Sequence, residues 1–569
     1  MMQPLYLDYL SCPVQYATYD DFNKKFQITK PECFNFAYDV ADRIAAEEPD
    51  RLAVLWTDES GQCIRYTFGE LMEESNRAAN WFTSLGIVKG DRVMLVLRRH
   101  LQFWPILMAL HKIGAVAVPA THLLTEKDVI YRVNAAGIRM IVATYRNETI
   151  LSACLAAQQA CPGLQTLAIL KGRREGFVSY NQEVLACSPQ WMRPTGDAYP
   201  CNEDPLLLYF TSGTTGMPKM VQHNHYYPLG HIVTAVYWQQ CVNGGIHLTI
   251  SETGWAKSVW GKLYGQWLAG SAVFVYEFER FIARDVLRQL SQHGITSFCA
   301  PPTMYRYLLQ ESFDGYDLSK LQHCSVAGEP LNPDMAAEWL KRTHVPLLEA
   351  FGQTELVVTL ATFPFMKVCP GSMGKPSPLF DVDLIDEDGN SCPPGVTGEI
   401  VVRADPQARP VGMFGGYYQD GDRTQSVWAD GIYHTGDVAW RDEWGYYWYV
   451  GRSDDVIKSS GYRIGPFEVE SALLEHPAVL ETAITGAPDE LRGQVVKATI
   501  VLKPGYLASE ELKKELQEHV KHTTAPYKYP RIIEFVSELP KTISGKIRRV
   551  ELRQKAETQI DPSKGEPKI

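Results

Sequence analysis

The chain has 569 residues, a length well beyond the size at which a single hydrophobic core usually stops growing, so a large domain of several lobes and a smaller domain are expected. Hydrophobic residues make up 45% and charged residues 21% of the chain, which is typical of a folded globular protein and excludes a disordered or fibrous one. The net charge of −11 argues against nucleic acid or an anionic membrane as a partner, because both need concentrated positive surface.

The sequence shows no targeting signal, membrane span or cysteine framework. No apolar run approaches the ~20 residues that span a bilayer. Residues 1–22 have neither the basic start of a secretory signal nor the arginines of a transit peptide. A cytoplasmic location is therefore expected, or the mitochondrial matrix if a presequence has been removed. The 12 cysteines include no Cys-x-x-Cys pair, which argues against a zinc site or a disulfide framework.

Short apolar or β-branched runs alternate with longer amphipathic stretches between residues 51 and 503. This alternation predicts βαβ units and parallel sheets, in which ligands bind where strands meet loops. The main body is therefore expected to be α/β. The clearest predicted strands are VMLVL at 93–97, AVAVPA at 115–120, LLLYF at 206–210 and HCSVAG at 323–328.

The pattern changes near Asp381. The segment DVDLIDEDGNSCPPGVTGEIVVR reads as two alternating strands around a turn region, which predicts a smaller antiparallel β lobe. Farther on, Ser453, Asp454 and Asp455 favour a solvated turn, so we expect a domain boundary at Asp454. Residues 1–453 would form the large N-terminal domain and residues 454–569 a compact α+β domain.

A loop rich in small residues directly follows the strand LLLYF. Its main-chain N–H groups, hydroxyls and terminal lysine suit a polyphosphate. The spacing Gly-x-x-Gly-x-x-Lys is not that of a Walker A loop, and a plain surface turn is the alternative interpretation for the loop taken alone. The predicted phosphate-binding residues are Thr211, Ser212, Gly213, Thr214, Thr215, Gly216 and Lys219.

This loop, as YFTSGTTGMPKMVQHNH, resembles the phosphate-binding signature of the adenylate-forming superfamily, which includes acyl-CoA synthetases, adenylation domains and luciferases. The whole sequence is most similar to the medium-chain acyl-CoA synthetases of that superfamily. The resemblance implies a large N-terminal domain of two doubly wound sheets plus the β lobe, with a mobile C-terminal domain. The other matches follow in the superfamily's order: AGEPLN at Ala327, EAFGQTE ending at Glu355, GSMGKP at Gly371, YHTGD ending at Asp437, GRSDDVIKSSGYRIGPFEVE from Gly451 and PKTISGKIRR around Lys546.

The resemblance implies an AMP-forming acid–thiol ligase with ATP, CoA and Mg²⁺ as ligands and a carboxylic acid as substrate. A homodimer is left open as the oligomeric state. One alternative is an adenylation enzyme that loads a carrier protein, but SETGWAK shows no obvious aspartate for a substrate ammonium group. Another alternative is a non-catalytic nucleotide-binding regulator. Against the regulator stand five intact chemical positions, namely Lys219, Thr354, Glu355, Asp437 and Lys546.

The motif FGQTE places a hydroxyl and a carboxylate side by side. Thr354 would hold the α-phosphate, and Glu355 would supply an oxygen ligand for Mg²⁺. Asp437 would accept hydrogen bonds from both ribose hydroxyls, with Arg452 completing the clamp. The resemblance alone implies the adenine slot, which comprises Gly328, Glu329, Pro330, Glu349, Ala350, Phe351 and Gly352.

Adenylation brings two anions together, so its main requirement is positive charge aimed at the transition state. Lys546, in the turn SGK, would be that cation. In relatives the C-terminal domain then rotates about a hinge aspartate, here Asp454, so that CoA reaches the adenylate. A glycine at 461 would let the pantetheine arm pass close to the backbone. The residues expected to face CoA are Ser460, Gly461, Tyr462 and Arg463.

Acetate-specific relatives carry a tryptophan immediately before QTE, where this chain has Gly352. Removing an indole opens room for several methylenes, each worth roughly 0.8 kcal/mol when buried. Medium-chain, branched or aromatic acids are therefore expected rather than acetate. Lys257 would pair with a polar acid or point to solvent. The predicted pocket residues, for which ordinary core packing is the alternative, are Trp255, Lys257, Trp260, Cys299, Thr303 and Gly352.

Overall fold

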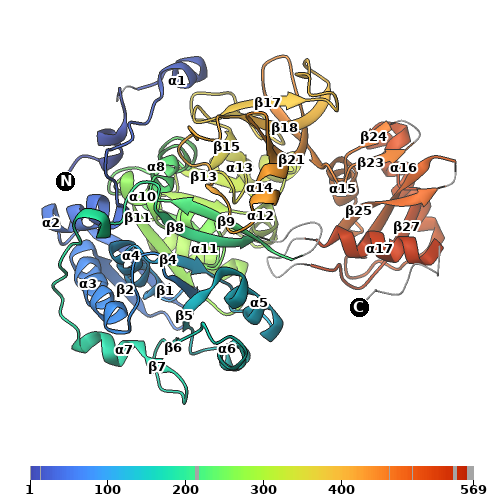
Figure 1. Ribbon diagram of the computed structural model, residues 1–569. Helices are drawn as coiled ribbons and strands as arrows, with labels where there is room; N and C mark the ends of the chain where they lie inside the picture. The colour runs from blue at the N-terminus through green and yellow to red at the C-terminus, as the bar shows by residue number, and fades with distance from the viewer. Residues whose placement is uncertain are drawn as a thin grey trace. The chain divides into compact units, whose positions relative to one another are not determined.

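The computed structural model describes residues 2–12, 15–211, 217–459, 462–489, 491–541 and 547–560. For residues 557–560 it describes the main chain only. Contacts divide the chain into two compact units. The first unit consists of Met1–Asp381 and Ala404–Gly431, and the second of Val382–Arg403 and Ile432–Ile569 (Figure 1). The predicted boundary at Asp454 lies within the second unit and remains a prediction.

One sheet of the first unit has eight strands in the order β19-β9-β8-β4-β3-β5-β6-β7. From β8 to β7 each strand is parallel to its neighbour, whereas β9 is antiparallel to β8. Parallel pairs need crossover connections, which α4, α5 and α6 provide. The bounds are Arg92–Val96 (β3), Val116–Pro119 (β4), Ile138–Ala143 (β5), Thr166–Ile169 (β6), Val178–Ser179 (β7), Pro205–Thr211 (β8), Lys219–Asn224 (β9), Gly416–Tyr417 (β19), Phe103–Ile113 (α4), Glu126–Ala136 (α5) and Glu148–Ala160 (α6).

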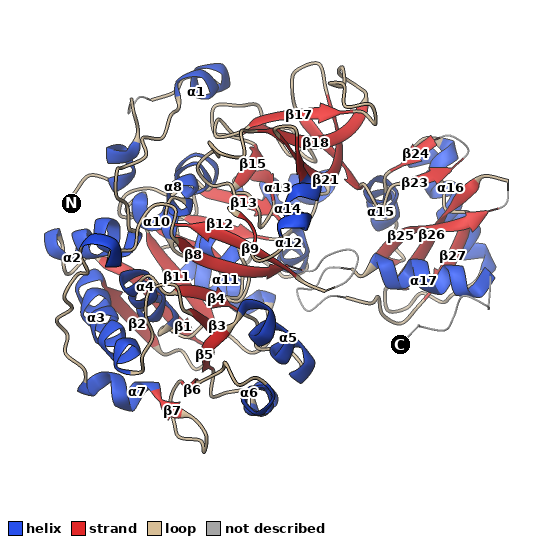
Figure 2. Cartoon of the chain, viewed as in Figure 1, coloured by secondary structure: helices blue, strands red, loops and turns tan. Residues whose placement is uncertain are grey.

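The other sheet of this unit has nine strands in the order β16-β15-β14-β13-β12-β10-β11-β1-β2, and its strands from β14 to β1 are parallel. Helices and strands alternate here too (Figure 2). The predicted α/β body with parallel sheets is confirmed, because every quoted run forms a strand. The bounds are Leu52–Asp58 (β1), Cys63–Thr67 (β2), Ile246–Thr249 (β10), Ala272–Glu277 (β11), Ser297–Ala300 (β12), His323–Ala327 (β13), Leu347–Gly352 (β14), Val358–Ala361 (β15), Lys375–Pro376 (β16), Lys257–Gly261 (α9), Ala283–Gln292 (α11), Pro302–Leu309 (α12) and Pro333–Thr343 (α13).

Helix α5 illustrates how the local sequence fixes a crossover. Thr125 caps its first turn and exchanges hydrogen bonds with Asp128, which satisfies main-chain N–H groups that the helix cannot. Gly137 ends the helix with a φ of 60°, in the left-handed region that favours glycine. Val129 and Val133 lie on its buried face and pack into the core beside the eight-stranded sheet. Each such valine contributes roughly 1.5–3 kcal/mol by leaving water.

The second unit combines the β lobe with the C-terminal elements. Strands β17, β18, β21 and β22 form one sheet, with β18 and β22 antiparallel to β21, which confirms the predicted lobe. A Cβ atom at Gly465 would lie 2.5 Å from the Val450 carbonyl oxygen, so a glycine lets β22 and the start of α15 pack closely. The bounds are Asp381–Ile385 (β17), Thr397–Arg403 (β18), Ile432–Arg441 (β21), Tyr447–Arg452 (β22), Ile457–Ser459 (β23), Tyr462–Ile464 (β24), Val479–Asp489 (β25), Gly493–Leu502 (β26), Ile532–Phe535 (β27), Pro466–Glu475 (α15), Glu510–Thr523 (α16) and Arg549–Ile560 (α17).

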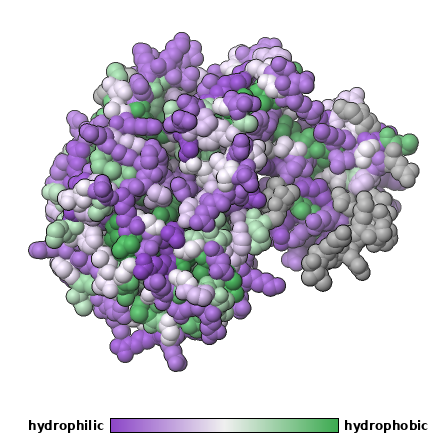
Figure 3. Space-filling model, in the orientation of Figure 1, coloured by the Kyte–Doolittle hydropathy of each residue, from purple (hydrophilic) through white to green (hydrophobic). Residues whose placement is uncertain are grey.

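The face of the molecule in Figure 3 is mostly hydrophilic, with smaller apolar patches between the hydrophilic residues. This agrees with a chain in which 21% of the residues are charged. Across the described residues, no helix has both the length and the apolar character needed to cross a bilayer.

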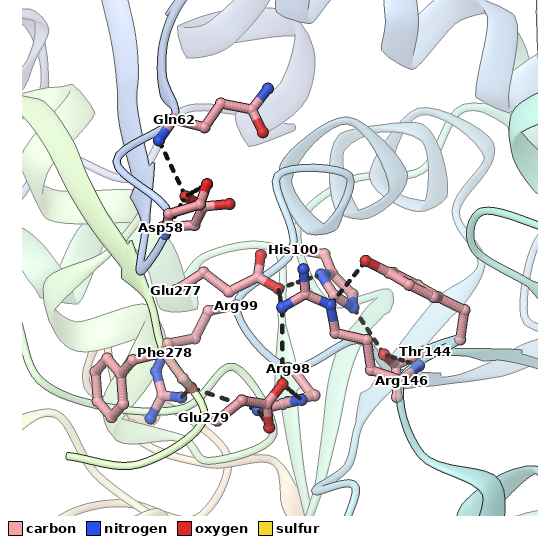
Figure 4. A network of polar contacts seen from close by, with 12 residues as sticks. Asp58, Gln62, Arg98, Arg99, His100, Thr144, Arg146, Glu277, Phe278 and Glu279 are labelled. Carbon is pink, nitrogen blue, oxygen red and sulfur yellow. Dashed lines mark hydrogen bonds and ion pairs between the residues drawn. The ribbon is translucent and has the colours of Figure 1, made fainter.

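A partly buried charged cluster joins the two sheets of the first unit at the carboxyl ends of β3, β5 and β11 (Figure 4). Arg98 pairs with Glu279 through two contacts of 2.7 and 2.8 Å. His100 lies 2.9 Å from a Glu277 oxygen and 2.7 Å from the Thr144 hydroxyl. This order of groups matches a hydrolase relay, but Thr144 is fully buried and has no access to a substrate. We interpret the cluster as a structural junction that holds the two sets of strand ends together.

Candidate functional site

Four predicted segments meet at one edge of the nine-stranded sheet. The neighbouring parallel strands β10, β12, β13 and β14 end at Thr249, Ala300, Ala327 and Gly352. Ala327 is aligned with Ala350 across the β13–β14 pair, so the AGEP and AFG motifs lie side by side. Ligands of α/β sheets bind at this carboxyl edge. The predicted adenine slot and the predicted acyl wall therefore belong to one region of the first unit.

The loop after β13 is held by carboxylates rather than left open. Glu349 accepts a hydrogen bond of 3.2 Å from the Leu331 N–H, and burial raises its pKa well above the usual range, so the side chain is neutral. Glu329 accepts a hydrogen bond of 2.7 Å from the Thr303 hydroxyl. Thus Thr303, predicted as an acyl wall residue, contacts a predicted adenine residue. Gly328 has a φ of 102°, which only glycine adopts without strain.

The space beside Gly352 is smaller than the missing tryptophan side chain suggests. A Cβ atom at Gly352 would lie 2.4 Å from Cη2 of Trp260 and 2.7 Å from the Val357 carbonyl oxygen. Trp260 is buried on α9. The absence of a side chain at Gly352 frees volume, but the indole of Trp260, which a neighbouring segment brings there, fills part of it. Trp260 therefore bounds this side of the predicted acyl pocket.

The other predicted pocket residues differ in their surroundings. Lys257 donates a hydrogen bond of 2.5 Å from Nζ to the Ala327 carbonyl oxygen, an arrangement that neither sequence interpretation included. Cys299 is buried within β12, and Trp255 is partly exposed just before α9. A role for these three residues in binding an acid remains a prediction.

The predicted phosphate-binding lysine and the predicted magnesium ligand are joined by one tyrosine. Lys219 begins β9, where Thr211 is its partner on β8. Its Nζ atom lies 3.3 Å from the Tyr417 hydroxyl, which donates a buried hydrogen bond of 2.9 Å to Oε1 of Glu355. The predicted residues Ser212, Gly213, Thr214, Thr215 and Gly216 lie outside the described part of the chain. Sequence reasoning missed Tyr417, because nothing near GGYY connects it to residues 62 and 198 positions away.

Thr354 is held from the other side by a histidine that the sequence left unassigned. His223 lies on β9 and is fully buried. Burial lowers its pKa to about 3, so the imidazole is neutral and can donate from Nε2. This atom lies 2.7 Å from the Thr354 carbonyl oxygen. The strand after the phosphate loop therefore positions the Thr354–Glu355 pair.

In the second unit, Asp437 on β21 is bound by two residues of β22. Tyr449 donates a hydrogen bond of 3.0 Å to Oδ1, and Nη1 of Arg452 lies 3.0 Å from Oδ2. Burial, together with the Asp437 carboxylate, raises the pKa of Tyr449 well above the usual range, so its hydroxyl remains a donor. Asp437 and Arg452, which are predicted to bind the ribose together, are in direct contact, and their binding of ribose remains a prediction.

Other predicted residues of this unit have local partners. Arg452 Nε lies 3.7 Å from an oxygen of Asp454. Arg463 pairs with Glu387, and the ring of Tyr462 stacks on another tyrosine ring. Their roles as hinge and CoA contacts remain predictions. The predicted residues Ser460, Gly461 and Lys546 lie outside the described part of the chain.

Comparison with known proteins gives the family. The model of the AMP-binding enzyme family matches residues 41–418, and the model of its C-terminal domain matches residues 468–546. The chain belongs to the AMP-binding enzyme family. The predicted superfamily is thereby confirmed.

Relatives within the AMP-binding enzyme family cover nearly the whole chain. Acyl-coenzyme A synthetase ACSM3, mitochondrial, of Mus musculus is 42% identical over 97% of this chain and 96% of its own length. Human acyl-coenzyme A synthetase ACSM5, mitochondrial, is 43% identical over 92% of this chain and 90% of its own length. The solved anthranilate CoA ligase AuaEII in complex with anthranoyl-AMP has a TM-score of 0.83 and 28% identity, and the match covers 93% of this chain and 99% of that one. The predicted fold class is confirmed by this likeness.

Proposed function

We propose that this chain is an AMP-forming acyl-CoA synthetase. A carboxylic acid and ATP would give an acyl-adenylate and diphosphate, and CoA would then take the acyl group and release AMP. The observation that carries the proposal is the contact of Lys219 and Glu355 with one tyrosine hydroxyl, because a lysine and a carboxylate held close together suit a polyphosphate and its cation. Membership of the AMP-binding enzyme family and relatives named acyl-coenzyme A synthetases support the same activity.

Glu355 suits the magnesium ion that this reaction uses. Mg²⁺ prefers oxygen ligands and is commonly held by one or two carboxylates together with substrate phosphates. When bound, the ion would supply positive charge to the departing diphosphate. Lys219 would contact the polyphosphate, and the hydroxyl of Thr354 would hold the α-phosphate. The loop residues 211–216 would complete this cradle with main-chain N–H groups.

Asp437 is the group that we propose binds the ribose. Tyr449 and Arg452 hold the carboxylate in place, and its oxygens, which only accept hydrogen bonds, would accept from the ribose hydroxyls. The adenine would lie between the loop 328–330 and the strand end 349–352. Because Glu349 is buried and neutral, its contribution there would be to hold the loop rather than to contact the base.

The acid would approach the α-phosphate from the acyl pocket beside Gly352 and Trp260. A pocket bounded by an indole suits an apolar chain or ring, and one solved relative is a ligase for the aromatic acid anthranilate. Medium-chain, branched or aromatic acids are therefore the proposed substrates. Lys546 would supply the positive charge that lets the carboxylate meet the nucleotide.

Thioester formation needs a second arrangement of the site. We propose that residues 454–569 move as a body relative to residues 1–453, with Asp454 as the hinge. Gly461 and its neighbours Ser460 and Tyr462 would then face the pantetheine arm, and Arg463 would bind a phosphate of CoA. The partners would be the small molecules of the reaction, with a homodimer as a further possibility. The relatives named mitochondrial make the mitochondrial matrix the proposed location.

The test is diphosphate exchange into ATP with a panel of acids from acetate to dodecanoate, followed by CoA-dependent AMP release. Exchange without CoA-dependent release would indicate an enzyme that loads a carrier protein, and no exchange with any acid would indicate a nucleotide-binding regulator. The Lys546→Ala protein should lose about 10²–10³-fold in adenylation rate, the usual cost of one transition-state contact. Lys541→Ala removes a lysine of the same segment that pairs with Glu481, and it should retain the parental rate. A Lys546→Ala protein as fast as the parent would exclude the proposed catalytic role.

A further inference from the structure

Tyr417 stands between two opposite charges in a way that fixes the direction of both hydrogen bonds. A lysine ammonium group can only donate and a carboxylate can only accept, whereas a tyrosine hydroxyl does both. The hydroxyl therefore accepts from Lys219 at 3.3 Å and donates to Oε1 of Glu355 at 2.9 Å. The lysine is also 5.0 Å from the centre of the tyrosine ring, within the range of a cation–π contact.

The surrounding backbone holds this arrangement in place. Tyr417 is aligned with Val221 across the β19–β9 pair, two residues beyond Lys219 on the same strand. The Phe414 N–H donates a hydrogen bond of 2.8 Å to the carbonyl oxygen of Glu355. Tyr417 and Glu355 are both buried. The hydroxyl thus lies at a point that three separate segments define, and its bond to Glu355 is buried, where hydrogen bonds to charged groups are strong.

We propose that Tyr417 is a positioning residue that couples polyphosphate binding at Lys219 to cation binding at Glu355. The proposal rests on the function proposed above, in which these two residues bind the nucleotide and Mg²⁺. The hydroxyl occupies one oxygen of Glu355 and so orients the other. It also separates the ammonium group from the carboxylate. Without it, Lys219 and Glu355 could form a direct ion pair, and each would lose part of its charge for the ligand.

Coupling of this kind is measurable as a ratio of two affinities, because linkage makes the cation raise nucleotide affinity by the same factor that the nucleotide raises cation affinity. The experiment is isothermal titration calorimetry of ATP into the full-length protein, once with Mg²⁺ and once with EDTA. The coupling ratio is the dissociation constant of ATP measured with EDTA divided by the one measured with Mg²⁺. In the Tyr417→Phe protein this ratio should fall about tenfold, as expected for one hydrogen bond to a charged group.

Tyr418→Phe is the matched control. This neighbouring tyrosine is partly exposed, and its hydroxyl accepts a hydrogen bond of 3.3 Å from Gln419. Its loss should leave the ratio at the parental value. Glu355→Gln reaches the same coupling from the other side: the ratio should fall in that protein too, and adding Tyr417→Phe should lower it no further.

An unchanged ratio in Tyr417→Phe would overturn the proposal. Equal losses of ATP affinity with and without Mg²⁺ would give that result and would indicate a purely structural role. If Tyr417→Phe does not fold, a normal ratio in Glu355→Gln overturns the proposal by itself. Failure of the proposed function would look different. A parental protein that binds ATP with an intact Mg²⁺ effect but makes no adenylate from any acid would refute the synthetase and leave the coupling standing.

Discussion

Two buried carboxyl groups, one in each unit, have opposite electrostatic surroundings. Glu349 at the end of β14 and Asp437 on β21 have exposed fractions of 4% and 5%. Asp437 has a guanidinium group and a phenol hydroxyl at 3.0 Å. Glu349 accepts one main-chain hydrogen bond, and its Oε2 atom has no hydrogen-bond partner among the described residues. Burial makes a charged group costly unless it is paired, so Glu349 is protonated while Asp437 has a cation beside it.

The difference suggests what each group is for. A protonated carboxyl group is a neutral spacer that holds the loop after β13 at the strand edge. A paired carboxylate keeps acceptor capacity for a hydroxylated ligand. Two acidic residues that look alike in the sequence therefore have different surroundings, which fit a structural role for Glu349 and the proposed ligand-binding role for Asp437, and substitutions at the neighbours should separate these roles.

The largest effect is expected from removing the cation of Asp437. Arg452→Met should destabilise the second unit by about 2–3 kcal/mol, because a buried carboxylate would lose its partner. Arg441→Met is the control, since this arginine at the end of β21, the strand of Asp437, donates to the main-chain carbonyl of Cys392. The shift in the midpoint of urea unfolding measures both. Equal shifts in the two proteins would mean that the ion pair contributes nothing beyond packing.

A smaller effect with a defined pH dependence is expected at Glu349. Its pKa is raised in the folded chain, so above the usual value near 4.3 the unfolded chain loses a proton that the folded chain keeps. The free energy of unfolding of the parent therefore falls as pH rises, by up to about 1.4 kcal/mol per pH unit. Glu349→Gln removes this dependence and should be the more stable protein at pH 8. Urea midpoints at pH 5 and pH 8 give the measurement.

Glu252→Gln provides the opposite case for this experiment. Burial alone would raise the pKa of Glu252, but the hydrogen bond and charge of His122, 3.0 Å away, lower it. Stability from this group is present above its unfolded pKa and lost as pH falls, so the substitution should destabilise most at neutral pH. If raising the pH changed the stability difference from the parent in the same direction for Glu349→Gln and Glu252→Gln, the proposed contrast between the two glutamates would be wrong.

The smallest expected effect, counted per methylene of the substrate, is on the selectivity for acid chain length. Trp260→Leu should open the space beside Gly352, and each further methylene bound there is worth roughly 0.8 kcal/mol, or about fourfold in kcat/KM. Trp444→Leu serves as control, because Trp444 is exposed and lies in the second unit, outside the predicted pocket. The chain-length profile of CoA-dependent AMP release is the measurement. An identical profile in the parent and in Trp260→Leu would remove the indole from the pocket.

The parallel strands and several chemical groups were predictable from the sequence because they depend on local patterns. Runs such as VMLVL form strands wherever both faces are covered, and the motifs single out Lys219 and Glu355 as groups that suit a nucleotide and its cation. Asp437 and Arg452 are likewise singled out by their motifs. Each of these features follows from a short stretch of sequence whose effect on structure or chemistry has a known physical cause.

The remaining contacts depend on packing between distant segments, which no local pattern records. Tyr417 meets Glu355 across 62 residues, and His223 meets Thr354 across 131. Trp260 fills the space at Gly352 because α9 brings it there, a fact that the glycine alone could not reveal. The partner of Lys257 is a main-chain carbonyl, which has no sequence signature at all.

The contact between Gly352 and Trp260 also restricts how this pocket could change over evolution. A Cβ atom at 352 would collide with the indole, so any side chain there must be preceded by a smaller residue at 260. In the reverse order, the intermediate protein would have the indole at 260 and the new side chain at 352 in the same space. A lineage moving toward shorter acids would thus have to replace Trp260 before it gained a tryptophan at 352, and the main chain at Val357 would have to shift as well.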